Sequence, residues 1–533
     1  MEVDMRQRPV LYRAGTIVSQ DGTEPEALAV AGDRVCATGT FRQLSDRYPE
    51  AQVVDLGDAV VVPGFNDAHA HLADTVQSRL DLDVSPSSVV GVDGLLGAVR
   101  ERAASRRGWV LAGNYDDSVT GRIDRAMLDA AAAATPVIVR HVSAHWAVLN
   151  SRALEELGID EDAPDVAGGS YGRDAHGRLD GRIYERALLG RYVSRPGDAL
   201  APLPTPEPAD VMAEYARVTA EWNAVGITSM CDAFVGPRQL EIHSMARAQG
   251  DTSIRVAMLI AAERYEEYRA LGLGTDFGDE WLRVAGIKAF VDGAIGGRTC
   301  RVSEPFVGTH DHGMLISTQE ELDALVGRVH ADGNRLAVHA NGDVAIRMLL
   351  QAYETARRTV QTGVRHRIEH CSIVDAEIIT RIAALALTVV PFSAYARFYG
   401  GRLEEWYGPE RIERLFAHRA FLDAGVPVAA STDHPASPIA PLGAIQSMVT
   451  RRGVDGARVG GTQAITVEEA IGVYTVGSAT ATGEERRKGR LAPGYLADFV
   501  ALGADPRRVD PEGISEIPVR ATFTGGRLVH SGE

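Results

Sequence analysis

The feature that most constrains the fold of this chain is a strand-then-helix rhythm through its middle. Apolar runs typical of buried strands alternate with amphipathic stretches such as TQEELDALVGRVHADG and DVAIRMLLQAYETARRTV. Near-continuous apolar strands alternating with helices favour a parallel sheet, and eight of them favour a closed barrel. The eight candidate strands cover residues 61–71, 226–232, 253–261, 286–293, 335–343, 366–373, 387–393 and 426–434. The sequence therefore predicts an α/β fold built on a (β/α)8 barrel of the TIM type.

Three regions are predicted around this rhythm. Both ends of the chain are rich in short strand-like runs, which predicts one small β-sandwich domain assembled from residues 1–62 and 485–533. The barrel is expected over residues 63–484. Residues 74–222 are too long for one crossover, so we expect an inserted subdomain after the first barrel strand, over the barrel mouth.

Composition excludes several classes of function. The formal net charge is −17 and no basic cluster is interleaved with aromatic residues, which argues against nucleic acid and anionic membrane surfaces as partners. No apolar run reaches 18 residues, and the N-terminal MEVDMRQRPVLYRAG has no signal-peptide pattern. The expected location is the cytoplasm. The four cysteines form no CxxC pair and are expected to be buried, reduced thiols.

The strongest local motif is PGFNDAHAHL. Side chains two apart in a strand point the same way, so His69 and His71 would both face one site and could bind a metal such as zinc. A bare HxH pattern is weak by itself. The similar pair His310 and His312 lies in a polar loop and is expected to be solvated surface.

Three further polar residues end predicted strands. His339 closes RLAVHA, His370 closes HRIEH and Asp433 closes VPVAASTD. Polar residues at the carboxyl ends of barrel strands converge on one site. Any one of them could be a satisfied core group, but packing alone does not explain five such groups at the same end of different strands.

Lysine is the rarest basic residue in this arginine-rich chain and occurs only as Lys288 and Lys488. Lys288 lies in the middle of a predicted strand, where an unpaired ammonium would be costly. Two interpretations stay open: a carbamylated lysine that bridges two metals, or a salt bridge to Asp292 or another barrel carboxylate. Lys488, in ERRKGRLAPG, is expected to be solvated.

Taken together, these motifs resemble the amidohydrolase superfamily, and within it the amidohydrolase family 3 branch that includes N-substituted formamide deformylases. The resemblance covers nearly the whole chain. It includes PGFNDAHAHL, HWAVLNSRAL, GGSYGRDAHGRLDGRIYE, GIKAFVDGAIGGRT, LAVHANGDVAI, HRIEHCSIV, ASTDHPAS and GRLAPGYLADFVAL. The order HxH, Lys, His, His, Asp on successive strands is specific to the superfamily.

The resemblance implies a role for each matching residue. One or two divalent ions, expected to be zinc, would be held by His69, His71, Lys288, His339, His370 and Asp433, with Lys288 as the carbamylated bridge and Asp433 also the catalytic acid and base. Residues expected near the substrate are Tyr115, His145, Glu185, Asp292 and Arg298. Arg298 could instead fix its loop through a salt bridge, and His145 could simply pack beside Trp146.

The chain departs from the family pattern in the predicted insertion. It has Gly113-Asn114-Tyr115-Asp116 where relatives usually carry Gly-Trp-Asp, and Ser143-Ala144-His145 where they often have Asp-Gly before the histidine. Both changes put the identity of the substrate in doubt and leave the metal centre untouched.

The resemblance implies hydrolysis of an amide- or formamide-type C–N bond of a small molecule. Ester or lactone hydrolysis, deamination and C–C bond cleavage stay open, because the superfamily shares one centre across many substrates. The alternative that is not an enzyme is a non-catalytic binding or regulatory protein on a hydrolase scaffold. In such a protein we would expect some of the metal-ligand positions to be filled by other residues. A homodimer is compatible with the sequence, although no feature of the sequence indicates one.

Overall fold

A parallel β-sheet forms the centre of the molecule. The computed structural model describes residues 8–532 except 106–107 and 251. Seven strands are hydrogen-bonded in the order β19-β18-β17-β16-β15-β14-β7, and all neighbours in this sheet run parallel. They are β7 (Phe65–Ala70), β14 (Ile227–Val235), β15 (Arg255–Ala261), β16 (Leu282–Phe290), β17 (Leu336–Ala340), β18 (Arg367–His370) and β19 (Thr388–Pro391). The expected α/β class is confirmed.

The predicted eighth strand is not a regular strand. Residues 426–433 are extended and bond to both edges of the sheet. On one side Ala429 N–H donates to Val389 O at 2.9 Å, and on the other Ala68 N–H donates to Ala430 O at 2.9 Å. Pro427 has no N–H to donate, and Asp433 has a left-handed backbone, so no continuous ladder forms. The segment nevertheless joins the first and last strands of the sheet.

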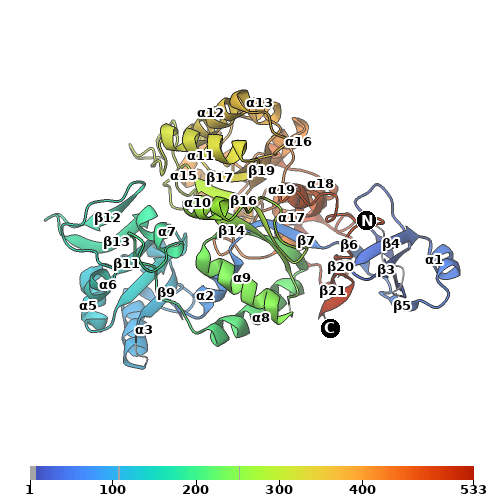
Figure 1. Ribbon diagram of the computed structural model, residues 1–533, viewed down its shortest axis with the longest axis horizontal. Helices are drawn as coiled ribbons and strands as arrows, with labels where there is room; N and C mark the ends of the chain where they lie inside the picture. The colour runs from blue at the N-terminus through green and yellow to red at the C-terminus, as the bar shows by residue number, and fades with distance from the viewer. Residues whose placement is uncertain (1–7, 106–107, 251, 533) are drawn as a thin grey trace.

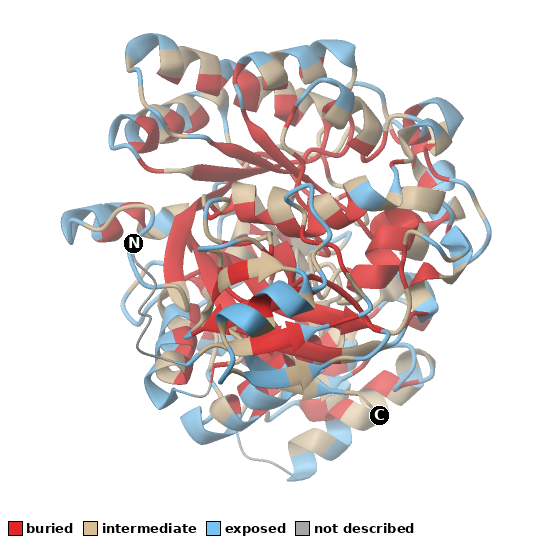
Figure 2. Cartoon of the chain, turned by 90° about the vertical axis from the view of Figure 1, so that its right-hand side faces the viewer, coloured by how far each residue is buried: buried red, intermediate tan, exposed pale blue. Residues whose placement is uncertain are grey.

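Helices cover the outer face of this sheet, and Figure 2 shows the buried strands between half-exposed helices. In α12 (Asp343–Thr359) the buried positions Ile346, Leu349, Leu350 and Tyr353 recur at helical spacing and form one apolar face. The other helices of this part are α9 (Pro237–Gln249), α10 (Tyr265–Ala270), α11 (Gln319–Ala331), α13 (Ala376–Ala384), α14 (Tyr395–Tyr399), α15 (Gly401–Ile412), α16 (His418–Asp423), α17 (Pro441–Thr450), α18 (Val467–Gly472) and α19 (Ser478–Ala481). The strand residues of the sheet are buried throughout, apart from the two end residues of β16.

The two ends of the chain meet in one region, on the right of Figure 1. Strand β6 (Val60–Pro63) pairs antiparallel with β20 (Phe499–Leu502) in a five-stranded sheet of order β2-β6-β20-β21-β22. A second sheet has the order β4-β3-β1-β5. The remaining bounds are β1 (Val10–Arg13), β2 (Thr16–Ile17), β3 (Ala27–Ala31), β4 (Arg34–Gly39), α1 (Phe41–Arg47), β5 (Gln52–Asp55), β21 (Val519–Thr524) and β22 (Arg527–Ser531). Tyr12, Phe499 and Phe523 pack ring against ring between the sheets.

The region predicted as an insertion contains a sheet of its own, on the left of Figure 1. Its order is β12-β13-β11-β10-β9-β8. The strands are β8 (Leu82–Asp83), β9 (Val110–Tyr115), β10 (Val137–His141), β11 (Trp146–Leu149), β12 (Gly169–Arg173) and β13 (Leu179–Glu185). The helices of the region are α2 (Leu72–Arg79), α3 (Gly91–Ser105), α4 (Asp117–Thr120), α5 (Arg125–Ala132), α6 (Ser151–Glu156), α7 (Arg186–Tyr192) and α8 (Pro208–Ala224). The domain boundaries given above stay predictions.

Among the described residues, no helix is both long enough and apolar enough to cross a bilayer. Residues 1–7, which begin the segment expected to lack a signal-peptide pattern, lie outside the described residues.

Candidate metal centre

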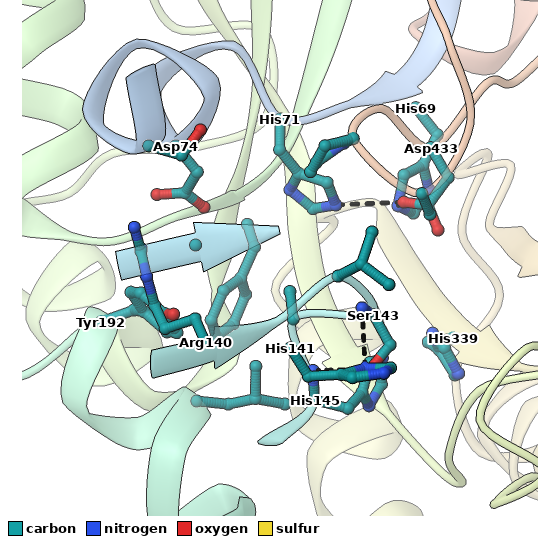
Figure 3. Close-up of a pocket in the computed structure, with 18 of the residues that line it drawn as sticks. His69, His71, Asp74, Arg140, His141, Ser143, His145, Tyr192, His339 and Asp433 are labelled. Carbon is teal, nitrogen blue, oxygen red and sulfur yellow. Dashed lines mark hydrogen bonds and ion pairs between the residues drawn. The ribbon is translucent and has the colours of Figure 1, made fainter. Parts of the chain in front are cut away.

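The HxH motif lies at the carboxyl end of β7. His69 is within the strand and 1% exposed, while His71 follows the strand and begins α2. The Nε2 atoms of His69 and His71 lie 3.3 Å and 3.1 Å from Oδ1 of Asp433 (Figure 3). One ligand atom from each of the three residues lies within 4.8 Å of the other two. Such a cluster of two imidazoles and a carboxylate could hold a metal ion.

The backbone fixes Asp433 against the histidine strand. Its N–H donates to His69 O at 2.8 Å, and its φ of 54° is left-handed. The preceding residue is also anchored, because Thr432 Oγ1 donates to Oδ2 of Asp67 at 2.6 Å. A left-handed conformation is uncommon for an aspartate and turns its side chain away from the direction that an extended strand would give it.

Lys288 reaches the same cluster from β16. Its Nζ lies 3.4 Å from Nε2 of His69, and its side chain is 1% exposed. Burial lowers the pKa of this amine to about 8. Within the described part of the chain, no carboxylate oxygen lies within 4.0 Å of Nζ, so the alternative salt bridge to Asp292 or another barrel carboxylate is not observed; Glu369 and Asp433 act on the amine only through their charges.

His339 and His370 complete the group from β17 and β18. Their ring centroids are 4.6 Å apart, and the ring of His370 is also 4.6 Å from that of His69. Burial lowers the pKa of both imidazoles well below the usual range, which keeps them neutral. Nδ1 of His370 is buried and has no hydrogen-bond partner among the described residues. An unpartnered buried imidazole nitrogen next to two further histidines fits a metal ligand.

A residue that the sequence analysis missed orients His69. Nδ1–H of His69 donates to the carboxylate of Glu369, which also accepts from Arg367. Burial raises the pKa of Glu369, but the charges of Arg367 and His69 outweigh burial and leave it below the usual range. Glu369 thus leaves Nε2 of His69 free to face the cluster. The signal was available in HRIEH, where Arg367 and Glu369 lie two apart on one strand face.

Two of the residues predicted near the substrate form a pair. Nδ1–H of His145 donates to Oε2 of Glu185 at 2.7 Å, and the His145 ring centroid lies 5.8 Å from that of His339. His145 therefore reaches the cluster from the predicted insertion (Figure 3). It is also bonded to Glu185 rather than simply packed beside Trp146.

The other three predicted substrate residues lie differently. The buried Tyr115 hydroxyl donates to Gly121 O at 2.7 Å, within its own loop. Asp292 is buried and accepts backbone N–H groups from Arg301, Asn341 and Gly342 at 2.8–2.9 Å. Arg298 is exposed at a cavity edge, and no salt bridge to it is found among the described residues.

Two cavities meet at the cluster. The first, of about 920 Å³ including its open mouth, is bounded by His69, His71, Lys288, His370 and apolar side chains, including Leu189, Phe234 and Phe290. The second is lined by more polar residues, including several arginines and tryptophans. Both cavities are lined by His145, His339 and Asp433. A small molecule could therefore occupy both sides of the cluster at once.

A second group of possible ligands lies at the rim. Asp116, Asp117 and His141 each offer an atom within 4.8 Å of the others. His141 is already bonded to Ser143 and stacked on Trp146. The group lacks the buried, unpartnered nitrogen that marks the cluster around His69.

The prediction for the second lysine was wrong. Lys488 is only 5% exposed, and its Nζ lies 2.8 Å from Oε2 of Glu484. Arg283 reaches the same carboxylate at 3.2 Å. The local sequence is polar and gave no sign of burial: Glu484 lies only four residues before Lys488, but Arg283, at the start of β16, joins the pair only when the chain folds.

Comparisons with known proteins give a consistent result. The family described as "Amidohydrolase family" matches residues 52–530. The chain is 28% identical over 527 residues to YtcJ of Bacillus subtilis (strain 168), a protein that carries the name of an amidohydrolase, with 96% of this chain and 97% of that protein covered. It is 29% identical over 525 residues to the N-substituted formamide deformylase of Arthrobacter pascens, with 94% of each chain covered.

Among solved structures, a metal-dependent hydrolase of uncharacterised activity from Pyrococcus horikoshii OT3 superimposes with a TM-score of 0.76. It is 23% identical, and the match covers 95% of this chain and 99% of that one. At this identity the likeness shows the shared fold.

Proposed function

The chain belongs to the amidohydrolase family, and from this premise we propose that it cleaves an amide- or formamide-type C–N bond of a small molecule at the cluster around His69. The family assignment makes it a metal-dependent hydrolase that acts on carbon–nitrogen bonds. The finer proposals are the ligand set, the metal, the proton carrier and the type of amide.

The observation that carries the proposal is the convergence of six donor groups from five segments of the barrel, two of these groups from the end of β7. Asp433 Oδ1 lies within 3.3 Å of both motif histidines, and Lys288 lies within 3.4 Å of His69. His339 and His370 adjoin them ring against ring. Burying this many polar side chains costs free energy, and packing of a hydrophobic core gives no compensation for that cost.

The donor set fits one or two zinc ions. Imidazole nitrogen and carboxylate oxygen are ligands that zinc accepts, and the buried Nδ1 of His370 has no hydrogen-bond partner among the described residues. We assign His69, His71, His339, His370 and Asp433 as ligands. When bound, the metal supplies Lewis acidity, which polarises the scissile carbonyl and lowers the pKa of water.

Lys288 is proposed to join the ligands as a carbamate. The unprotonated form of Nζ, which a pKa of about 8 makes accessible near neutral pH, adds to the carbon of CO2; an N–C bond forms and one proton leaves to solvent, which turns the amine into an anionic oxygen donor. The absence of a carboxylate within 4.0 Å among the described residues supports this role, since it leaves the amine without an ion-pair partner. Protein loaded with zinc in ¹³C-bicarbonate should give a carbamate ¹³C signal that Lys288→Met lacks. Full metal occupancy without that signal would rule the carbamate out.

Asp433 is proposed as the proton carrier. Its carboxylate lies beside both motif histidines at the meeting point of the two cavities, so it can reach a water and the scissile bond alike. It takes a proton from the attacking water and returns it to the leaving nitrogen. Burial lowers the pKa of His145, but the charge of Glu185 outweighs burial and raises it, so the protonated ring would donate a hydrogen bond from Nε2 to the substrate while Nδ1–H holds Glu185.

A formamide or related amide is the proposed substrate. The reason is that one relative, whose match covers 94% of each chain, is named an N-substituted formamide deformylase. Ester or lactone hydrolysis, deamination and C–C cleavage would use the same ligands. Analysis of the products formed from formamides, N-acyl compounds, cyclic amides and lactones separates these reactions.

We also propose the finer architecture given above: a (β/α)8 barrel over 63–484 closed by residues 426–433, a mouth covered by residues 74–222, and a β-sandwich domain from both ends of the chain. Pairing of β6 with β20 supports the β-sandwich domain from both ends of the chain. The first cavity is lined by residues of the predicted insertion and of the barrel, which supports a covered mouth. A cytoplasmic location and a homodimer remain expectations.

The decisive experiment measures metal content and turnover in the same variants. The His69→Ala/His71→Ala double variant should lose both the metal and hydrolysis of N-substituted formamides. His310→Ala, at an exposed loop position, serves as the matched control and should retain both. Turnover by the metal-free double variant would refute the proposal.

A further inference from the structure

The second cavity beside the metal cluster carries unpaired positive charge. Arg122, Arg298 and Arg402 line it and come from three separate segments: the loop after α4, the loop after β16, and α15. Within the described part of the chain, none of the three guanidinium groups has a hydrogen bond or salt bridge to a protein group. In a chain with a formal net charge of −17, most cavity arginines would be expected to find carboxylates.

The carboxylates lining the same cavity are already occupied. Glu185 accepts from His145, and Asp433 lies against the motif histidines. Asp117 lies 3.5 Å from Nε2 of His141, and Asp116 accepts the N–H of Ser118 as the N-cap of α4. A fourth arginine of the cavity, Arg182, is paired with Asp180. Among the described residues, none of these carboxylates is in contact with the three arginines; Arg122 acts on Asp117 only at longer range, where its charge adds to the His141 hydrogen bond in lowering the pKa of Asp117.

The backbone of its loop fixes the position of Arg298. Its φ of 52° is left-handed, and its N–H donates to Ile295 O at 3.2 Å. Thr299 ties the loop to Ala294 through a hydrogen bond of 2.9 Å. The guanidinium carbon lies 5.8 Å from the centroid of the Trp406 ring, a cation–π distance. A strained residue in an ordered loop, stacked at a cavity wall, points to a ligand-binding role.

The first cavity differs in character. Leu189, Tyr192, Phe234 and Phe290 give it an apolar wall next to Lys288 and His71. Since His145, His339 and Asp433 border both cavities, a substrate amide at the cluster would extend one substituent into each.

Resting on the proposed amide hydrolysis, and selecting a substituted amide over a formamide, whose carbonyl carbon bears only hydrogen, we infer that the preferred substrate has an apolar, aryl-sized group on one side of the scissile bond and an anionic group, such as a carboxylate, on the other. The apolar group enters the cavity walled by Phe234 and Phe290. The anion is bound by Arg122, Arg298 and Arg402. A guanidinium suits this task because its planar donors match a carboxylate bidentately.

Matched substrates test this inference. N-phenylacetylglycine and N-benzylsuccinamate place the carboxylate on opposite sides of the amide; N-ethylphenylacetamide and N-benzylbutanamide are their neutral counterparts with methyl in place of the carboxylate. We expect kcat/KM for one anionic amide to exceed that of its neutral counterpart at least tenfold.

Arg298→Gln and Arg402→Gln should each cut that ratio about tenfold or more, and added salt should reduce it. Arg358→Gln, an exposed arginine on α12, should leave it unchanged.

Binding without turnover separates this inference from the proposed function. Trp146 and Trp406 line the arginine cavity, so N-phenylacetylglycine should alter tryptophan fluorescence of the metal-free protein, and less so in Arg298→Gln. Binding by this criterion with no hydrolysis of any amide would reject the proposed reaction and support the anion site. Equal rates for anionic and neutral amides, with ratios unaffected by the arginine variants, would overturn the inference.

Discussion

His370 shows how single residues depart from strand geometry to build the cluster. In an extended strand, Glu369 and His370 would point to opposite faces. His370 instead has a φ of 67° and Cys371 a φ of 41°, so the strand ends in two left-handed residues. Such conformations cost about 1–3 kcal/mol each and persist where the surroundings enforce them. They let Glu369 orient His69 while His370 itself reaches the cluster.

Glu369→Gln tests the orienting role. Glutamine keeps an acceptor of the same size but loses the charge that holds Nδ1–H of His69, so we expect zinc affinity to fall about 10- to 100-fold. Chelator competition on the purified protein measures this. Glu410→Gln, at an exposed position of α15, is the control. Unchanged affinity in Glu369→Gln, with the fold intact by circular dichroism, would remove Glu369 from the account.

At the scale of elements, the loop after β16 is tied to the start of α12 through one carboxylate. Asp292 accepts N–H groups from Arg301 at one end and from Asn341 and Gly342 at the other. The Nδ2 atom of Asn341 in turn lies 3.0 Å from the Nε2 atom of His339. The loop that presents Arg298 and the strand end that presents His339 are thereby positioned together. We therefore expect Asp292 to position the substrate site through these groups; its expected place near the substrate stays a prediction.

Asp292→Ala should loosen this connection. Because an error of about 1 Å in the placement of reacting groups can cost about 10²-fold, kcat/KM should fall by roughly that factor. Limited proteolysis should cut within 293–301 faster than in the wild type. Asp311→Ala changes an exposed carboxylate farther along the same loop and should behave as wild type. Wild-type kinetics and proteolysis in Asp292→Ala would contradict the positioning role.

The same elements show what could be predicted. Apolar runs and the order of polar residues at their ends predicted the α/β class and the residues that gather around His69. The irregular eighth segment escaped prediction because Pro427 and the left-handed Asp433 act through backbone geometry. Glu369 was missed although Arg367 lies two residues away on the same strand face, because its other partner, His69, lies 300 residues away and only folding brings the two together.

At the scale of the whole molecule, the two lysines lie at opposite ends of one strand and have different roles. Lys288 is near the carboxyl end of β16, beside the metal cluster, whereas Lys488 pairs with Glu484, which Arg283 also contacts near the amino end of β16. In barrels of this type the carboxyl ends carry chemistry and the amino ends carry stability. Burial raises the pKa of Glu484, but Lys488 and Arg283 outweigh it and lower the pKa to about 2.

This pair predicts a pH-dependent stability. A carboxyl group with a lowered pKa in the folded state stabilises the protein above its unfolded pKa, and that contribution is lost as the pH falls from about 4.5 toward 2. Lys488→Met should lower the free energy of unfolding by about 3 kcal/mol at neutral pH, and the difference from wild type should shrink below about pH 4.5. Urea unfolding over this pH range measures it. Arg486→Met, an exposed neighbour, is the control, and a pH-independent difference would exclude the mechanism.

Anomalous X-ray diffraction at the zinc edge, from crystals of the zinc-loaded protein, tests the central claim most directly. The account predicts anomalous density among His69, His71, Lys288, His339, His370 and Asp433. A peak only at the rim group of Asp116, Asp117 and His141, or no peak at all from a catalytically active protein, would contradict it.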